Sequence, residues 1–409
     1  MSAAPQHFSE LAQQPPRRLR NSSFVNCGVA GFAVAAVLSH LLILRVGLSP
    51  WIQFVCGVTA AVGLLGTALA VKVFTGEDGF VFYRDAITAL VFVGIVLHLL
   101  HQPVLPYLDV TILGAGLFQA FGRIGCLLVG CCHGRPARFG VRYETKHAQN
   151  GFPRCFVGTR LLPIQAIESI YVVSLVFLGC RLLLSSPPRG SVTAFYILAY
   201  ACGRFWLELF RGDVERPFFG GFSQAQWISL VLAALAACSE RLGILPQSQW
   251  HWAVPLSIAS AMSLLYVHRR CDPSDRFELT HPRHIRELAE AMQGLDISFS
   301  PDRKATNSES STQSVQLLQT SAGLRLSSGK LSLFGRRMVY FSVSRHPRQL
   351  ELRQVRRLAI LISRLNSFTV PFDLKPSASG VFHILFSFPT LEPDPSQARK
   401  MLDNNVPAC

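Results

Sequence analysis

The sequence predicts an all-α polytopic membrane protein of seven or eight transmembrane helices, followed by a small soluble α+β domain. Half of its 409 residues are hydrophobic and only 15% are charged, whereas soluble domains are typically about 25% charged. The apolar residues gather in long runs between positions 24 and 267. Beyond Arg269 the composition becomes that of a water-soluble protein, so we expect a second domain there.

The apolar runs have the length of membrane spans. A transmembrane helix needs roughly 20 mostly apolar residues, and in lipid each backbone amide needs an internal hydrogen-bond partner. Seven runs meet this requirement, and an eighth, which contains His251 and Pro255, is possible. In chain order the expected spans are 24–44, 51–71, 86–101, 107–122, 163–184, 192–210, 222–237 and, as the possible eighth, 249–267. A polar arm, 123–162, separates the fourth span from the fifth.

Soluble segments flank the membrane domain, 24–268. A basic segment, 1–23, precedes it without a convincing signal-peptide cleavage site. We expect a linker at 269–314 and a soluble α+β domain at 315–409, in which no catalytic pattern is visible. Its strand-like and helix-like runs are 315–328, 336–345, 380–389 and 350–365. The net charge of +15 fits loops held at an anionic membrane surface, and we expect no nucleic-acid partner.

The span at 192–210 contains the densest set of polar groups. Tyr200, Arg204, Glu208 and Arg211 follow one another at intervals of four, four and three residues, which places them on one helix face. Charged groups are costly inside a membrane, so this face needs a partner. One interpretation is an Arg–Glu–Arg ladder that joins helices. The other is a phosphate site in which Glu208 orients the arginines, because a guanidinium donates two parallel hydrogen bonds to phosphate.

A second arginine, Arg123, lies where we expect the fourth span to end. Its small neighbours Gly122 and Gly125 would let a head group or another backbone approach closely. An interfacial arginine that reaches toward water is the alternative. Arg123 and Arg204 come from different helices and could converge on one anionic head group.

The arm begins with thiol groups beside a histidine: Cys126, Cys131, Cys132 and His133, followed by Gly134. Structural zinc sites favour two well-separated cysteine pairs, and the second pair is missing here, although Cys155 or His147 could complete a site. A thiol redox or metal protein is therefore the weaker alternative, and our leading prediction assigns no metal.

The fifth span begins with two polar residues one turn apart, Gln165 and Glu168, just after Pro163. A proline in the first turn is an ordinary helix start. Glu168 could pair with an arginine or act as a base, and the sequence leaves both possibilities open.

Taken in order, these motifs resemble the prolipoprotein diacylglyceryl transferase family. GRIGC at 122–126 is similar to its GRIGN-type signature, and P-x-Q-x-x-E at 163–168 to its HPxQLYE block. YACGRFWLELFRGD at 200–213 is similar to its Y-x-x-x-R-x-x-x-E-x-x-R block, and FSQAQWIS at 222–229 matches the segment that follows. The resemblance covers about residues 50–240.

This resemblance implies an enzyme of the bacterial inner membrane that moves a diacylglyceryl group from phosphatidylglycerol to the lipobox cysteine of a prolipoprotein. Glycerol phosphate would leave, and we expect no cofactor. The family's essential arginines correspond to Arg123 and Arg204, with Tyr200 as a further catalytic candidate. The expected substrate-binding residues are Arg123, Gly122, Gly125, Cys126, Gly134, Gln165, Glu208 and Arg211. Fixed guanidinium groups would stabilise the charge that grows on the phosphate.

The chain departs from the family in its third span. The family has a His-Gly-Gly block there, whose histidine is a candidate base, whereas the comparable stretch here contains Tyr83, Arg84 and Asp85. His133 and Glu168 are the substitutes that we expect. A lipid-binding or scaffolding protein without catalysis, or a transferase with another acceptor, is the alternative. The positive-inside rule places the arm in the cytoplasm, but we follow the family, which places it outside.

Overall fold

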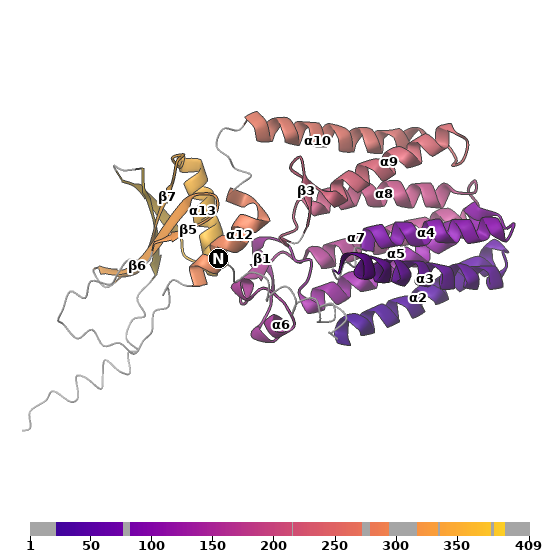
Figure 1. Cartoon of the computed structure of the whole chain (residues 1–409), viewed down its shortest axis with the longest axis horizontal. Coiled ribbons are helices and arrows are strands. Elements are labelled where there is room, and N and C mark those ends of the chain that lie inside the picture. Colours follow the sequence, from indigo (N-terminus) through magenta and orange to yellow (C-terminus); the bar gives the residue numbers. More distant parts are fainter. Residues whose placement is uncertain are drawn as a thin grey trace, which may run out of the picture. The chain divides into compact units, whose positions relative to one another are not determined.

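The computed structural model describes residues 22–76, 82–214, 216–271, 279–293, 317–333, 336–377 and 380–388. The chain divides into two compact units, Met1–Cys271 and Asp272–Cys409. The first is mostly helical, and the second is built around a β-sheet (Figure 1). The division falls where the composition of the sequence becomes that of a soluble protein.

Long helices that lie alongside one another form the first unit (Figure 1). They are α2 (Ser22–Val46), α3 (Pro50–Thr75), α4 (Phe82–Leu99), α5 (Val104–Val129), α7 (Ile164–Leu184), α8 (Ser191–Glu208), α9 (Gln224–Arg241) and α10 (Ala253–Cys271). Within the described ranges, four of them (α2, α3, α5 and α7) are long and apolar enough to cross a membrane. The chain is therefore a helical membrane protein, and four of the seven or eight expected spans meet both criteria.

The outward surface of these helices is apolar. On α3, Leu65 and Leu69 are 65% and 62% exposed, and no residue within 4 Å would meet a side chain at Gly66 between them. A soluble protein rarely exposes apolar patches of this extent. Lipid chains would cover such a face, which fits a membrane environment.

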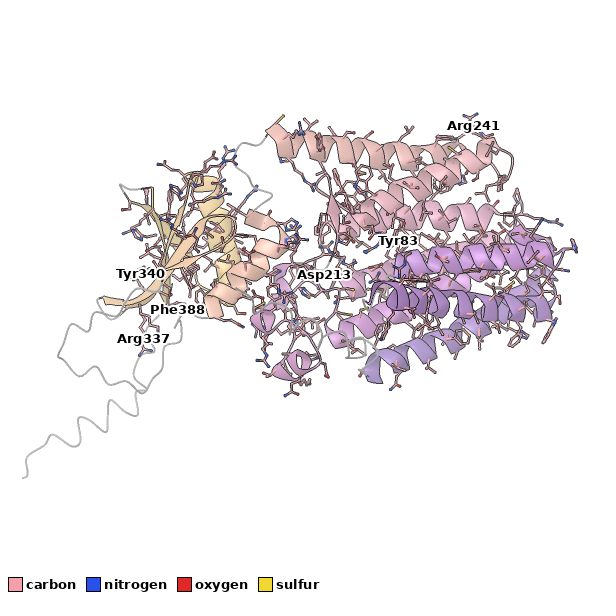
Figure 2. The ribbon with its side chains drawn as sticks, viewed as in Figure 1. Tyr83, Asp213, Arg241, Arg337, Tyr340 and Phe388 are labelled. Carbon is pink, nitrogen blue, oxygen red and sulfur yellow. The ribbon has the colours of Figure 1, made fainter. Side chains whose placement is uncertain are left out.

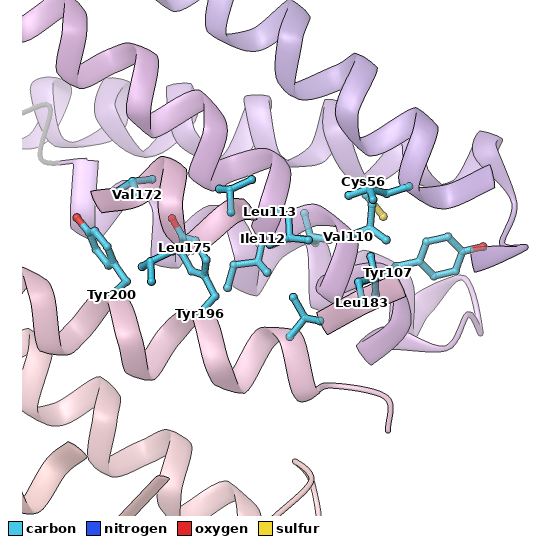
Figure 3. Packing of buried hydrophobic residues seen from close by; sticks show 14 of the residues in the cluster. Cys56, Tyr107, Val110, Ile112, Leu113, Val172, Leu175, Leu183, Tyr196 and Tyr200 are labelled. Atoms are coloured by element: carbon cyan, nitrogen blue, oxygen red, sulfur yellow. The ribbon is translucent and has the colours of Figure 1, made fainter. Parts of the chain in front are cut away.

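The core of the first unit forms around α5, which packs against α2, α4, α7 and α8. Leu113 of α5, Val172 and Leu175 of α7 and Tyr196 of α8 belong to one cluster of buried residues (Figure 3). Buried Asp109 of α5 accepts three hydrogen bonds of 2.7 Å, from the backbone N–H groups of Gly190 and Thr193 and from the Thr193 hydroxyl. A carboxylate at this place satisfies the first N–H groups of α8, so Asp109 positions α8 against α5.

The end of α5 differs from the predicted boundary, and the difference bears on the site. The fourth span was expected to end at 122, but α5 continues to Val129, so Arg123 lies well inside a helix. The residues after Cys126 are apolar and continue the helical contacts. The helix ends at Gly130, whose left-handed conformation (φ 86°) lets its N–H group bond to the Cys126 carbonyl.

The arm therefore begins after Val129 and folds back on the helix ends. It contains β1 (Pro136–Arg142), α6 (Thr145–Gln149), the short 3-10 helix η1 (Arg154–Phe156) and β2 (Arg160–Leu161), with β1 and β2 antiparallel. The Arg135 N–H group donates to the Phe210 carbonyl over 3.1 Å. A second antiparallel pair, β3 (Phe218–Phe219) and β4 (Phe222–Ser223), leads into α9, and η2 (Gln249–Trp252) precedes α10.

The second unit is an antiparallel sheet with helices packed on it. Its elements are α12 (Pro282–Gln293), β5 (Leu318–Gln319), β6 (Leu324–Leu333), β7 (Arg336–Arg345), α13 (Leu352–Leu365), β8 (Phe372–Pro376) and β9 (Phe382–Phe388), with the strand order β5-β6-β7-β9-β8. Alternate residues of β7, such as Val339 and Phe341, face the core, where they meet Leu358 of α13. The expected small α+β region is thus present.

Within the described residues of the expected linker at 269–314, Pro282–Gln293 form the helix α12. Leu288 and Met292 on this helix are buried in the core of the second unit, which explains why the segment folds. The stretch 299–314, for which we expected flexibility, lies outside the described residues.

Candidate functional site

Arginines from two helices meet at one carboxylate. Nη2 of Arg123 on α5 lies 3.0 Å from Oε1 of Glu168 on α7, and Nη1 of Arg204 on α8 lies 3.6 Å from Oε2 of the same residue. Arg123, Arg204 and Glu168 are 8%, 4% and 1% exposed, respectively. Because each arginine takes a different oxygen, Glu168 holds the two guanidinium groups on either side of itself. The predicted convergence of Arg123 and Arg204 is therefore seen in the geometry, with Glu168 between them.

Two neutral side chains complete the environment of Glu168. The Tyr200 hydroxyl donates to Oε1 over 3.1 Å, and Nε2 of Gln119 donates to the Tyr200 oxygen over 2.5 Å and to Oε1 over 3.4 Å. The Tyr83 ring of α4 lies edge-on to that of Tyr200, with centroids 5.5 Å apart. Two arginines and two neutral donors therefore surround this carboxylate.

A second carboxylate, Glu208 at the end of α8, binds three arginines. Its Oε2 lies 2.8 Å from Nη2 of Arg204 and 3.6 Å from Nη1 of Arg211, and its Oε1 lies 2.5 Å from Nη1 of Arg216. Arg211 also makes two hydrogen bonds to Asp213, of 2.9 and 2.7 Å. Burial opposes the charge of Arg211, but the neighbouring Asp213 carboxylate keeps the pKa of Arg211 above its ordinary value.

The whole cluster has more positive than negative groups. Arg123, Arg204, Arg211 and Arg216 face Glu168, Glu208 and Asp213, so four guanidinium groups against three carboxylates leave one positive charge. Among the described residues, Nε and Nη1 of Arg204 are buried without a hydrogen-bond partner. Buried donors of this kind are costly unless a partner satisfies them. The arrangement is suited to an anion that accepts hydrogen bonds from Arg204.

Arg211 was expected on the same helix face as Tyr200, Arg204 and Glu208, and this expectation is wrong. The helix α8 ends at Glu208, and the following backbone bonds to the arm. Arg211 forms an antiparallel bridge with Gly134, and the N–H group of Gly212 donates to the His133 carbonyl over 2.9 Å. Arg211 still reaches Glu208, from a turn that the arm holds in place.

The cysteine turn after α5 lies beside this cluster. The Gln165 side chain, one turn before Glu168, donates to the Cys131 carbonyl over 2.8 Å. The His133 ring lies edge-on to the rings of Phe152 and Phe156, and its Nδ1 is 2.9 Å from the Gly134 carbonyl. Burial lowers the pKa of His133, so the ring is neutral at pH 7.

The three predicted glycines differ in their surroundings. A Cβ atom at Gly134 would lie 2.4 Å from the Leu162 carbonyl oxygen, and one at Gly125 would lie 2.9 Å from the Phe24 ring. These two glycines allow close packing of the chain itself. At Gly122 no atom lies within 4 Å of such a Cβ, so only this position leaves room next to Arg123.

Sequence reasoning did not single out Gln119, Asp213 or Arg216. Gln119 precedes Arg123 by four residues and therefore shares its helix face, a signal that was available in the sequence. Arg216 and Asp213 lie beyond the end of α8, where no helical period relates them to Glu208. Figure 2 shows that Asp213 and Tyr83 lie toward the same end of the helical unit, whereas Arg241 lies at the opposite end.

Known proteins match the region that contains this cluster. The family model for prolipoprotein diacylglyceryl transferase matches residues 29–239. The phosphatidylglycerol–prolipoprotein diacylglyceryl transferase of Clostridium tetani is 32% identical over 155 residues, which cover 37% of this chain and 59% of that protein. The protein of the same name from Dehalococcoides mccartyi is 35% identical over 129 residues, which cover 32% of this chain and 48% of that protein.

The chain thus spans about half the length of the curated relatives that it matches. No solved structure matches it. The family match covers every residue of the cluster around Glu168 and Glu208 and slightly more than half of the chain. The chain therefore belongs to the prolipoprotein diacylglyceryl transferase family.

Proposed function

We propose that this protein transfers a diacylglyceryl group from phosphatidylglycerol to the thiol of the lipobox cysteine in a prolipoprotein, with glycerol phosphate as the leaving group. The names of the relatives support this assignment. The observation that carries it is the pair of buried arginines, Arg123 and Arg204, on one carboxylate, together with the buried Arg204 donors that have no hydrogen-bond partner among the described residues.

The charge of the cluster fits the reaction. When the glyceryl carbon–oxygen bond breaks, the phosphate changes from a monoanion to a species with a second developing charge. Guanidinium groups that are already oriented stabilise this charge more than that of the bound lipid. Glu168 and Glu208 would keep Arg123 and Arg204 in position, and Tyr200 would hold Glu168 through its hydroxyl.

The acceptor sulfur must be a thiolate to attack well, and the candidate bases are His133 and Glu168. Oε1 of Glu168 is already in contact with Arg123 and accepts a hydrogen bond from Tyr200. His133 is buried and neutral, so its second ring nitrogen could accept a proton. We also propose that Gln165, Cys126 and Arg211 contribute to substrate binding.

We also propose that the protein is a multi-pass protein of the bacterial inner membrane, with all eight long helices spanning. The helices α4, α8 and α9 have 18 residues each and α10 has 19. At 1.5 Å per residue they are about 27 Å long, close to the roughly 30 Å of a bilayer core. Each packs against another helix of the unit, which supports one common bundle.

The test uses the full-length protein in lipid nanodiscs with labelled phosphatidylglycerol and a lipobox peptide. Arg123→Ala and Arg204→Ala should each lower the transfer rate by about 100-fold or more, the usual effect of removing one donor that stabilises a developing charge. Arg181→Ala is the matched control, because Arg181 is exposed in the last turn of α7.

Full activity in both site variants would show that the assignment of the arginines is wrong. A wild-type protein that retains phosphatidylglycerol through purification but transfers nothing would support the lipid-binding alternative and refute the transferase.

A further inference from the structure

Three thiols gather at the end of α5. The sulfur atoms of Cys126, Cys131 and Cys132 all lie within 4.8 Å of one another. Cys126 and Cys132 are 3% and 7% exposed, and Cys131 is partly buried. The ten cysteines in the described part of the chain form no disulfide. No histidine, carboxylate or further cysteine of the described residues joins this cluster.

The backbone holds the thiols together in a conformation that a cysteine rarely adopts. Gly130 turns the chain back at the end of α5, and Cys132 itself has a positive φ of 55°, in the left-handed region that disfavours residues with a Cβ atom. Hydrogen bonds on both sides maintain this turn, from Gln165 to the Cys131 carbonyl and from Gly212 to the His133 carbonyl. Such a conformation persists only where its surroundings determine it.

We propose that Cys126, Cys131 and Cys132 bind one zinc ion as thiolates, and that the fourth position on the metal takes the sulfur of the acceptor cysteine. A zinc–sulfur bond is about 2.3 Å, so tetrahedral ligands lie about 3.8 Å apart. The sulfur atoms, within 4.8 Å of one another, need to approach by at most about 1 Å.

The number of ligands and the charge both indicate a reactive ion. Structural zinc sites have four protein ligands, whereas sites with three keep a position for water or substrate. Three thiolates and one zinc ion carry a charge of −1. Arg123 lies one helical turn before Cys126 on the same face of α5, so a guanidinium group is near to balance this charge.

This inference rests on the proposed transferase function and supplies its thiolate. The acceptor thiol would replace water on the zinc ion and lose its proton to the solvent, because a coordinated thiol is deprotonated. Its sulfur then forms a bond to the glyceryl carbon as the carbon–oxygen bond to phosphate breaks. The electron pair of that bond goes to the phosphate oxygen beside Arg123 and Arg204, and glycerol phosphate leaves. The thioether product is a weaker ligand than a thiolate and departs.

The first test measures metal in the full-length protein in nanodiscs after a brief wash with chelator. Elemental analysis should find about one zinc ion per chain, as expected for one three-thiolate site. Cys126→Ser and Cys132→Ser should lower this content at least about tenfold, whereas the control Cys238→Ser, at an exposed position on α9, should retain it. Unchanged zinc in the Cys126→Ser/Cys132→Ser double variant would overturn the proposal.

The second test uses wild-type protein, so it does not depend on the folding of variants. Cobalt(II) in place of zinc should give thiolate charge-transfer absorption, and a lipobox peptide should change that spectrum while its serine analogue does not. A cobalt spectrum that the cysteine peptide leaves unchanged would overturn the role in thiol activation. Zinc should also protect the three cysteines from alkylation by a maleimide, and equal labelling with and without zinc would overturn the site.

The two proposals fail in different ways. A protein that transfers the diacylglyceryl group at full rate without bound zinc would overturn the metal site and leave the transferase intact. A protein that binds zinc and the cysteine peptide but transfers nothing would keep the metal site and overturn the transferase.

Discussion

The replacement Glu168→Gln removes the charge of the carboxylate between the two arginines and keeps the shape of the side chain. The amide fills the same space, and its oxygen can still accept from Tyr200. It removes the negative charge between Arg123 and Arg204, which lie 3.0 and 3.6 Å from the two carboxylate oxygens. All three residues are buried, so solvent screens the loss only weakly.

The magnitude follows from the type of interaction. Removing one partner of a buried ion pair usually costs about 3–5 kcal/mol, because a charge remains buried without compensation. Here Arg204 keeps Glu208, 2.8 Å away, so the cost falls mainly on Arg123, and we expect about 3 kcal/mol. For a domain of this size that lowers the melting temperature by roughly 6–12 °C.

The measurement is thermal unfolding of the first unit in nanodiscs, followed by tryptophan fluorescence. Glu144→Gln is the control, because its partner Lys146 lies 3.0 Å away with both side chains about 70% exposed, and exposed pairs contribute little. A melting temperature for Glu168→Gln that equals that of Glu144→Gln would show that Glu168 does not hold the two arginines together.

Three further predictions concern packing, capping and pH. Gly134→Ala should unfold the arm and abolish transfer, because the new Cβ atom would lie 2.4 Å from the Leu162 carbonyl oxygen. Gly122→Ala is the control, since no atom lies within 4 Å of its new Cβ atom, and it should leave the melting temperature unchanged. Equal melting temperatures of the two variants would contradict the packing at Gly134. Asp109→Asn should destabilise the first unit by about 1–2 kcal/mol, the usual loss when a buried helix cap loses its charge, and an unaltered unfolding midpoint in denaturant would contradict that cap. Burial lowers the pKa of His284, so the stability that its neutral ring gives the second unit is complete above the ordinary value of about 6.5 and is lost as the pH falls below it. The protection of α12 amides from hydrogen exchange in the whole protein, relative to the intrinsic exchange rate at each pH, should therefore decrease as the pH falls below about 6.5 and do so less in His284→Gln; identical profiles would contradict the shift.

Helical periodicity explains which parts of the site could be predicted. Tyr200, Arg204 and Glu208 are spaced at four-residue intervals on one helix, so their common face follows from the sequence alone. The meeting of Arg123 and Arg204 was expected as a possibility, but the sequence does not indicate that a carboxylate on a third helix joins them. Glu168 was left open between an arginine partner and a base, and its ion pairs follow from the packing of α7 between α5 and α8.

The parts that could not be predicted depend on backbone contacts between segments distant in the sequence. Arg211 leaves the helical face because its backbone pairs with Gly134, and this pairing has no local signal. Arg216 reaches Glu208 only because the chain turns back after α8. The helix α12 was not predicted, because it lies in the expected linker and has few apolar residues. These residues are buried only because other segments of the second unit form the core that they join.

Glu168 also has a consequence for turnover under the proposed function. A lipid phosphate that enters the site meets two arginines that already have a counterion, so binding exchanges one anion for another. The net affinity is the difference between two strong interactions and stays moderate. When the glyceryl group has moved to sulfur, the same carboxylate can recapture both arginines, which favours the departure of the charged product and returns the enzyme to its resting state.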